Sequence, residues 1–455
     1  MRQTDQASPS GWRDIVIVDL DGGDRMQFFQ ELGAGIEQRW RQKNYSEEAF
    51  PTIAADALAE ADAITNVDPW EIVRQLHAVT DLPHQSIEDK FSDLPVVLYH
   101  GLRFHIDVYF WLDGTTSIHQ HGFSGAFQVL SGSSIHSLYS FAEEQKINPH
   151  FLIGRLSLKE VQLLKTGDIR HIRSGRDFVH SLFHLDRPSI TLTIRTLKDP
   201  AALPQFDYIK PYVAVNPFLR EISFIKQMQS VSLLLRAKHP EADSMISEFL
   251  LSSDFETAFA VLKTIFQYMT DQARERMFLK TDDENRDEPP EKLRLEKFFE
   301  TARLKHGSLV DLIPPLLSEF QRQDRLIRLR KHVTKHEHRF FLALLLNISE
   351  RKWLLDVVKQ HMPEKDPVET VCQWVSEFAM TPVFGMQEPN ALGIKDFSDL
   401  QLAVLRRALK GAFSKEGSHS ESEIEETMQS LRKSLLLKAI LESPTSAAAA
   451  STLSK

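Results

Sequence analysis

Hydrophobic and polar positions divide the 455-residue chain into three stretches with different periodicities. From residue 24 to about residue 44, apolar side chains recur every four positions, which is the spacing of one face of an α-helix. These side chains are Phe28, Leu32, Ile36 and Trp40. Two later segments before residue 80 are also helical in pattern, and Asp68 followed by Pro69 is typical of a helix start. The run at 14–20, DIVIVDL, could form a short strand.

Between residues 94 and 196 the pattern changes to short runs of β-branched and aromatic residues separated by turns that contain glycine. Such runs include LPVVLYH, FHIDVYFWL, AFQVLSG, FVHSLFHL and SITLTIRT. Many short strands at close spacing are typical of a sandwich or a barrel.

From residue 216 onward most segments are amphipathic with helical spacing, and no convincing fixed-period repeat is found. A polar linker at 280–292 interrupts them, and the small, polar tail at 443–455 is expected to be disordered. The sequence therefore predicts an α+β protein. We expect an N-terminal helical flank at 1–90, a β-barrel at 91–212 and a separate all-helical domain at 213–442.

Composition narrows the functional classes only modestly. A net charge of −9 and a pI near 6.1 give no global attraction to nucleic acid or to anionic membranes, so neither partner is expected. The single cysteine, Cys372, allows no intrachain disulfide and lies in an apolar helical segment typical of a buried structural thiol. The N-terminus lacks the shape of a signal peptide, and no window approaches a membrane span, so we expect a cytoplasmic protein.

Histidine gives the strongest chemical signal. The chain has 18 histidines, and nine of them lie between His100 and His184. In an extended strand, side chains two apart face the same way, so the segment SIHQH projects His119 and His121 together. The strand FVHSLFHL places His180 and His184 on one face. Two histidines from one strand and His180 from another could bind a metal ion and leave its remaining positions open, as in catalytic sites.

Two segments around these histidines resemble the motifs of the cupin superfamily over about residues 94–200. The first segment follows the cupin order of a glycine, a His-x-His pair and a second glycine. Its first glycine is one residue closer to the histidines than usual. Its residues are Gly114, His119, His121 and Gly132. The second segment is a looser match, because it lacks the usual Pro and Gly before its histidine. Its residues are Gly167, His180 and His184.

One departure from the cupin pattern narrows the resemblance. Most metal cupins have a glutamate ligand four or five residues after the second histidine, where this chain has Gly125 and Ala126. A set of three histidines without a carboxylate is similar to the thiol dioxygenases of the cysteine dioxygenase type. That resemblance implies a cupin barrel, Fe(2+) as cofactor, and O2 and a small thiol as substrates, with a sulfinic acid as product.

Several other residues are candidates for supporting roles. His184 could replace His180 as a ligand or could orient a ligand or the substrate, and we place it among the catalytic residues. Arg103 and Arg195 are candidates to bind a substrate carboxylate, although an exposed arginine at a strand end is an equally simple interpretation. Among the tyrosines we favour Tyr109 as a hydrogen-bond donor to substrate or O2. The others considered for that role are Tyr99 and Tyr139, and His105 and His136 could line the same cavity.

Two further interpretations of the sequence remain open. The barrel could be a non-oxidative metal cupin, such as an isomerase or a lyase, or a ligand-binding protein whose helical part engages a partner. The helical part could also cover the barrel, bind a larger substrate or form a homodimer. His332 and His336, spaced four apart on a basic helix, are a weak metal signal, and a solvated helix face explains them as well.

Overall fold

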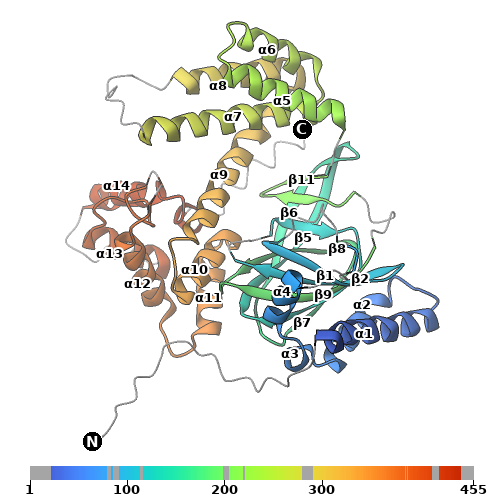
Figure 1. Cartoon of the computed structure of the whole chain (residues 1–455). Coiled ribbons are helices and arrows are strands. Elements are labelled where there is room, and N and C mark those ends of the chain that lie inside the picture. The colour runs from blue at the N-terminus through green and yellow to red at the C-terminus, as the bar shows by residue number, and fades with distance from the viewer. Residues whose placement is uncertain are drawn as a thin grey trace, which may run out of the picture.

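The computed structural model places a body of strands at the centre of the molecule, with helices on several sides (Figure 1). The model describes residues 22–78, 83–85, 92–112, 116–197, 204–218, 221–278, 290–384, 386, 388–411 and 420–441. The predicted strand at 14–20, the motif residue Gly114 and the predicted disordered tail at 443–455 lie outside these ranges. The expected mixture of helices and a β-barrel is confirmed.

Helices precede the strands, as the pattern predicts, and the described residues contain four of them where the sequence indicates three helical segments. They are α1 (Gly22–Gln42), α2 (Phe50–Glu60), α3 (Ala63–Asn66) and α4 (Pro69–Ala78). The helical stripe of α1 ends in Ile36 and Trp40, which are buried. At the start of α4, the Asp68 carboxylate accepts a hydrogen bond from the backbone N–H of Trp70 at 2.9 Å, so Asp68 caps this helix as expected.

Eleven strands follow within the described residues. They are β1 (Leu94–His100), β2 (Phe104–Trp111), β3 (Ile118–His121), β4 (Gly125–Ser131), β5 (Ser133–Asn148), β6 (Phe151–Lys165), β7 (Ile169–Ile172), β8 (Gly175–His184), β9 (Ser189–Thr196), β10 (Asp207–Ile209) and β11 (Val213–Val215). One sheet has the order β1-β2-β9-β4-β7, and the other closes on itself in the order β10-β11-β6-β5-β8-β3. The last two short strands extend the barrel to residue 215, beyond the expected end at 212.

The five-stranded sheet has two chemically different faces. Its outer face carries apolar side chains such as Phe104 and Ile106, which share a core with the N-terminal helices. The ring of Phe104 lies 5.7 Å from that of Phe50 in α2. Because side chains alternate along a strand, the intervening positions point inward toward the second sheet. There Trp111 of β2 stacks on His184 of β8, with ring centroids 4.6 Å apart.

The six-stranded ring encloses an apolar core of its own. Each of its strands contributes at least one buried side chain to this core: Ile118, Tyr139, Phe141, Leu152, Val179, Tyr208 and Ala214. Ile118 and Val179 alternate along β3 and β8 with His119 and His180, so these strands separate two interiors. One interior lies inside the ring, and the other lies between the two sheets.

The helices after residue 221 pack against the barrel in two groups. The helices are α5 (Ile222–Arg236), α6 (Ala242–Ser252), α7 (Phe255–Phe278), α8 (Pro290–His306), the 3-10 helix Gly307–Leu312, α9 (Ile313–Leu329), α10 (His336–Asn347), α11 (Arg351–His361), α12 (Pro367–Met380), α13 (Asp399–Lys410), α14 (Glu421–Arg432) and α15 (Lys438–Leu441). Figure 1 shows α5 to α8 at the far end of the long β5–β6 hairpin, and α10 to α14 beside the barrel.

Both helical groups share hydrophobic cores with strands, so the expected separate C-terminal domain is not confirmed. Phe151 and Ile153 of β6 lie in one core with residues of α5 to α9. Ile135 of β5 and Phe183 of β8 lie in another, with residues of α9 to α15. These apolar side chains of β5, β6 and β8 would otherwise contact water, and the helices bury them. Within the described residues, none of the helices combines the length and apolar character needed to cross a bilayer.

The shared core gives the first prediction. Replacing Phe183 by alanine removes a ring that is 1% exposed and lies beneath the guanidinium of Arg330. We expect the Phe183→Ala variant to lose about 3–5 kcal/mol of unfolding free energy, because a large buried side chain leaves a cavity. Helix content measured by circular dichroism and tryptophan fluorescence should shift together in denaturant. Leu102→Ala, at a side chain 95% exposed, is the control and should change stability by less than about 0.5 kcal/mol. Two separate transitions, with only one shifted, would contradict a shared core.

Candidate metal centre

Three histidines meet on one face of two paired strands. His119 of β3 is the direct antiparallel partner of His180 of β8, so the two side chains lie on the same face. His121 is two residues further along β3, so its side chain points to the same face. The ring centroids of the three imidazoles are 4.6–4.9 Å apart. One nitrogen from each ring lies within 4.8 Å of the corresponding nitrogens of the other two.

Hydrogen bonds orient these rings. His119 Nδ1 lies 2.8 Å from the carbonyl oxygen of Ser117 and donates to it, which leaves the lone pair on Nε2. The Nε2 atoms of His121 and His180 are 2.8 Å apart. His180 Nδ1 lies 2.9 Å from Nε2 of His136, a residue of the neighbouring strand β5. When the lone pair of His180 Nε2 binds another partner, the ring proton resides on Nδ1. Nδ1 then donates a hydrogen bond to Nε2 of His136.

The donor set suits a divalent metal ion. Imidazole nitrogens bind such ions at about 2.0–2.1 Å, so two ligands at a right angle are about 3 Å apart. The separation of 2.8 Å between the Nε2 atoms of His121 and His180 is close to that value. Among the described residues, the three histidines form the one group of His, Cys, Asp or Glu with this spacing.

Burial keeps these histidines neutral. His119, His121 and His180 are 2–4% exposed. Loss of hydration lowers the pKa of His119, and it lowers those of His121 and His180 well below the ordinary value. Burial, with the neighbouring Arg170, lowers the pKa of His136 to about 3. At neutral pH the rings therefore carry lone pairs that a cation can use.

Of the two positions where most metal cupins carry a glutamate, residue 125 cannot hold one in this chain. Gly125 begins β4 and pairs with Arg195 of β9. A Cβ atom at Gly125 would lie 2.0 Å from the carbonyl oxygen of Ile194, so this close approach of the strands requires glycine. The absence of a carboxylate ligand at this position therefore has a steric cause.

Aromatic and charged side chains surround the histidines on the inner faces of both sheets. The rings of Phe123 and Phe178 lie 4.5 and 6.1 Å from that of His121. The guanidinium of Arg195 lies 5.4 Å from the Phe123 ring, and its positive charge helps to lower the pKa of His121. Arg195 Nε donates to Asp107 at 2.5 Å.

Tyr109 lies on this inner face as well. Its hydroxyl donates to the same Asp107 oxygen at 3.0 Å. Tyr109 is therefore part of the polar group that also contains Arg195, on the sheet that faces the three histidines.

The structure places the two arginine candidates differently. Arg103 is exposed, and its guanidinium lies 4.2 Å from the ring centroid of Tyr45, in the outer helical layer. The turn between β1 and β2 directs it away from the sheet interior, so the structure does not bring it to the three histidines. Arg195, near the end of the paired strand β9 and opposite His105, points inward. Strand-end position alone does not distinguish these two orientations.

His184 is buried but does not orient the three histidines. Its Nδ1 lies 2.8 Å from the hydroxyl of Ser134, and its ring stacks on Trp111. The residue that contacts a member of the cluster is His136, which sequence reasoning named only as a possible cavity residue. The sequence signal for His136 is the alternation in β5, which puts it on the same face as Ser134. The β5–β8 register that brings it to His180 is not readable from one chain.

The remaining candidate residues make packing contacts and hydrogen bonds that are typical of structural side chains. Tyr99 packs on Gly33 of α1, and the hydroxyl of Tyr139 donates to Asn347 of α10 at 2.7 Å. Cys372 is buried, as expected, and burial raises its pKa to about 11. His336 is half exposed and bonds Ser133.

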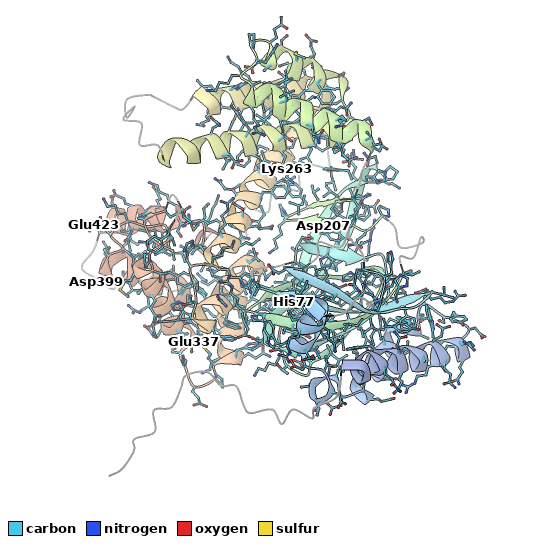
Figure 2. The ribbon with its side chains drawn as sticks, in the orientation of Figure 1. His77, Asp207, Lys263, Glu337, Asp399 and Glu423 are labelled. Atoms are coloured by element: carbon cyan, nitrogen blue, oxygen red, sulfur yellow. The ribbon has the colours of Figure 1, made fainter. Side chains whose placement is uncertain are left out.

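A half-buried carboxylate lies behind His119. Asp207 of β10 pairs with His119 across the strands and accepts a hydrogen bond from Ser117 at 3.0 Å. Burial raises the pKa of Asp207 and lowers that of Lys263 in α7, which lies on the same side of the barrel (Figure 2). Ser117 thus connects Asp207 to the carbonyl that holds the His119 ring.

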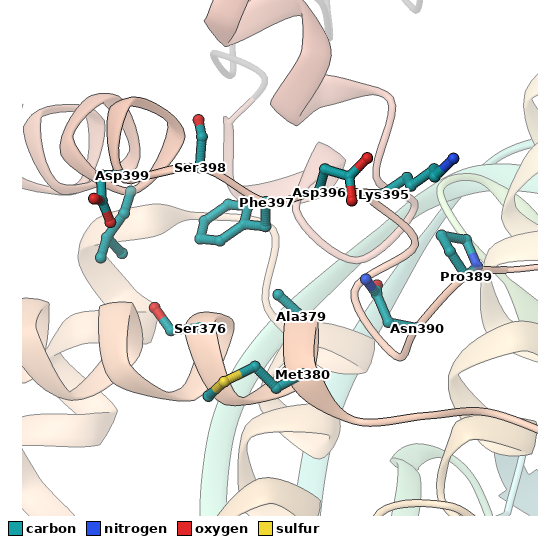
Figure 3. Close-up of a pocket in the computed structure, with 11 residues that line it drawn as sticks. Ser376, Ala379, Met380, Pro389, Asn390, Lys395, Asp396, Phe397, Ser398 and Asp399 are labelled. Carbon is teal, nitrogen blue, oxygen red and sulfur yellow. The ribbon is translucent and has the colours of Figure 1, made fainter.

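A cavity of about 430 Å³ lies in the C-terminal helices. It is bordered by Ser376, Ala379 and Met380 of α12 on one side (Figure 3). Phe397, Ser398 and Asp399, at the start of α13, border the other. None of the barrel histidines lines it, so it belongs to a different part of the molecule.

Comparisons with known proteins leave the function open. No protein-family model and no curated protein matches the chain. A chain of the hydroquinone 1,2-dioxygenase PnpCD, in a crystal structure with Cd2+ and 4-hydroxybenzonitrile, is 15% identical with a TM-score of 0.18. The match covers 31% of this chain and 71% of that one. A chain from crystal structures of the DMSP lyases RdDddP and RnDddQII is 15% identical with a TM-score of 0.22, over 40% of this chain and 96% of that one. At these scores the similarities carry no argument about activity.

The contact between His136 and His180 gives the second prediction. If His136 fixes the proton of His180 on Nδ1, then His136→Ala should weaken Co2+ binding by about 10–100-fold. Absorbance titration of the metal-free protein with Co2+ measures this affinity. His171→Ala, at an exposed histidine on β7, is the matched control and should bind as the wild type does. Equal affinities for all three proteins would show that His136 does not orient the cluster.

Proposed function

We propose that this protein is a cupin-type metal oxygenase in which His119, His121 and His180 hold one Fe(2+) ion. The proposed reaction oxidises a small thiol with O2 to a sulfinic acid. The observation that carries the proposal is the convergence of three buried, neutral imidazoles without a carboxylate. The resemblance of the segment around His119 to thiol dioxygenases supports the choice of reaction.

The charge of the ligand set favours an anionic substrate. Three neutral imidazoles leave the full double positive charge of a bound ion uncompensated, so a thiolate is stabilised in its deprotonated form. When bound, the ion supplies adjacent positions for the thiolate and for O2. Both oxygen atoms of O2 enter the sulfinic acid, and the thiol supplies all the electrons, so the reaction needs no external reductant.

The chain's own residues perform binding and exclusion of water. Phe123 and Phe178 cover one side of His121 and keep solvent from the cluster. Arg195 provides a cation on the facing sheet for a second anionic group of the substrate, such as a carboxylate. Asp107 and Tyr109 hold the arginine in place through the shared carboxylate oxygen. His136 maintains the orientation of the His180 ring.

Metal loading and O2 uptake test the proposal. The purified wild-type protein should contain about one Fe per chain and should consume O2 when cysteine is added under Fe(2+)-replete conditions. His121→Ala should lose most of the iron and the O2 uptake, because two imidazoles hold the ion less tightly than three. His332→Ala, at a histidine remote from the cluster, should match the wild type.

The outcomes of this experiment distinguish the alternatives. Stoichiometric metal without thiol-dependent O2 uptake would favour a non-oxidative metal cupin. Equal metal content in the wild type and His121→Ala would contradict the ligand assignment itself.

A carboxylate-binding role for Arg195 gives a separate prediction. Removing the arginine alone would leave Asp107 buried without its charge partner, so the double variant Asp107→Asn/Arg195→Met removes both charges together. We expect its KM for cysteine to rise about 10–100-fold, the loss expected for a charge-assisted hydrogen bond, with a smaller change in kcat. The KM for cysteamine, which lacks the carboxylate, should change little. Asp107→Asn alone is the control for loss of the carboxylate. A similar rise in KM for cysteine and for cysteamine in the double variant would exclude carboxylate recognition by Arg195.

A further inference from the structure

A second cavity, of about 580 Å³, lies at the mouth of the six-stranded ring. It is bordered by the ring strands β5 and β6, by α9, by the end of α10 and by α15. Tyr139, one of its lining residues, is the cross-strand partner of Val179. The side chain of Val179 points away from that of His180, because the two are neighbours on β8. The cavity therefore lies on the opposite side of this strand from the three histidines.

A buried amine lines the cavity. Lys210 Nζ donates to the carbonyl oxygens of Leu346 and Asn347 at 2.7 and 3.0 Å, and these are the last carbonyls of α10. A protonated amine has three N–H groups, so one donor remains after these two bonds. Within the part of the chain that the structure describes, no carboxylate lies within ion-pair distance of Lys210.

The nearby carboxylate is committed elsewhere. Glu319 of α9 receives two hydrogen bonds from the guanidinium of Arg322, at 2.7 and 2.8 Å, so these two charges compensate each other. The positive charge of Lys210 is therefore not paired with this carboxylate. Burial lowers the pKa of Lys210 to about 7, which is the expected effect when an ammonium lacks a close counter-ion. A further cation, Lys438, lines the same cavity.

Apolar side chains form much of the remaining wall. Leu156 and Leu158 come from β6, Pro314 and Pro315 from the start of α9, and Leu435 from the turn before α15. A pocket of this kind, mainly apolar with few converging polar groups, is typical of small-molecule sites. Phosphate has no apolar part to lie against these leucines and prolines, whereas a monoanion with an apolar body matches both parts of the wall.

From this arrangement we propose that the cavity binds a small monocarboxylate with an apolar tail. The carboxylate accepts the remaining hydrogen bond of Lys210 and compensates its charge. The tail lies against Leu156, Leu158 and the two prolines. This site is independent of the metal reaction proposed above, and its test uses the metal-free protein.

Calorimetric titration of the full chain with octanoate, 1-octanol and octylamine tests the proposal. These probes share a tail and differ in charge. The wild type should bind octanoate at least about ten-fold more tightly than octanol, and octylamine most weakly. Lys210→Met should weaken octanoate binding at least about ten-fold and leave octanol unchanged, because it removes the charge and retains the apolar stem. Lys226→Met, at an exposed lysine of α5, should behave as the wild type does.

The amine of Lys210 also caps α10, so Lys210→Met can disturb folding. A second variant therefore tests the cavity without removing this amine. Ala439→Phe fills the cavity from α15 and should abolish the binding of octanoate and octanol alike. Circular dichroism of each variant reports whether the helices have formed. The proposal is overturned if the wild type binds no octanoate, if octanol binds as tightly as octanoate, or if Ala439→Phe leaves octanoate binding intact.

Discussion

The antiparallel pairing of β3 with β8 is the constraint on which the site depends. This pairing sets His119 directly opposite His180, and the alternation of side chains along β3 adds His121. A shift of either strand by one residue would turn its histidines into the apolar core of the ring and would expose Ile118 or Val179 to the other interior. The apolar residues on one face of these strands therefore hold the histidines in position on the other face.

The two faces of β8 connect the histidine cluster to the helices. On the face opposite His180, the hydroxyl of Ser181 lies 3.4 Å from the amide oxygen of Asn347, which also accepts from Tyr139. Asn347 is the last residue of α10, and Lys210 donates hydrogen bonds to the last backbone carbonyls of this helix. The strand that carries His180 is thus fixed by hydrogen bonds to α10, on the face away from the cluster.

The sequence predicted the elements better than their partners. Alternation in SIHQH was sufficient to place His119 and His121 together, and the spacing in α1 was sufficient to predict the buried Ile36 and Trp40. The closure of the six-stranded ring through β10 and β11 could not be predicted, because these strands have three residues each and show no periodicity. The role of His136 depends on the register of β5 against β8, and the orientation of Arg195 depends on that of β9 against β4. Register is a property of two strands, which a single pattern does not specify.

The uncharged state of the cluster has a consequence for how the protein is made. A site that includes carboxylates concentrates like charges when no ion is present, and the chain must then fold against that repulsion. Here the imidazoles are neutral, and those of His121 and His180 hydrogen-bond to each other, so the cluster adds no such repulsion. Folding of the barrel therefore does not require a cation to hold like charges together.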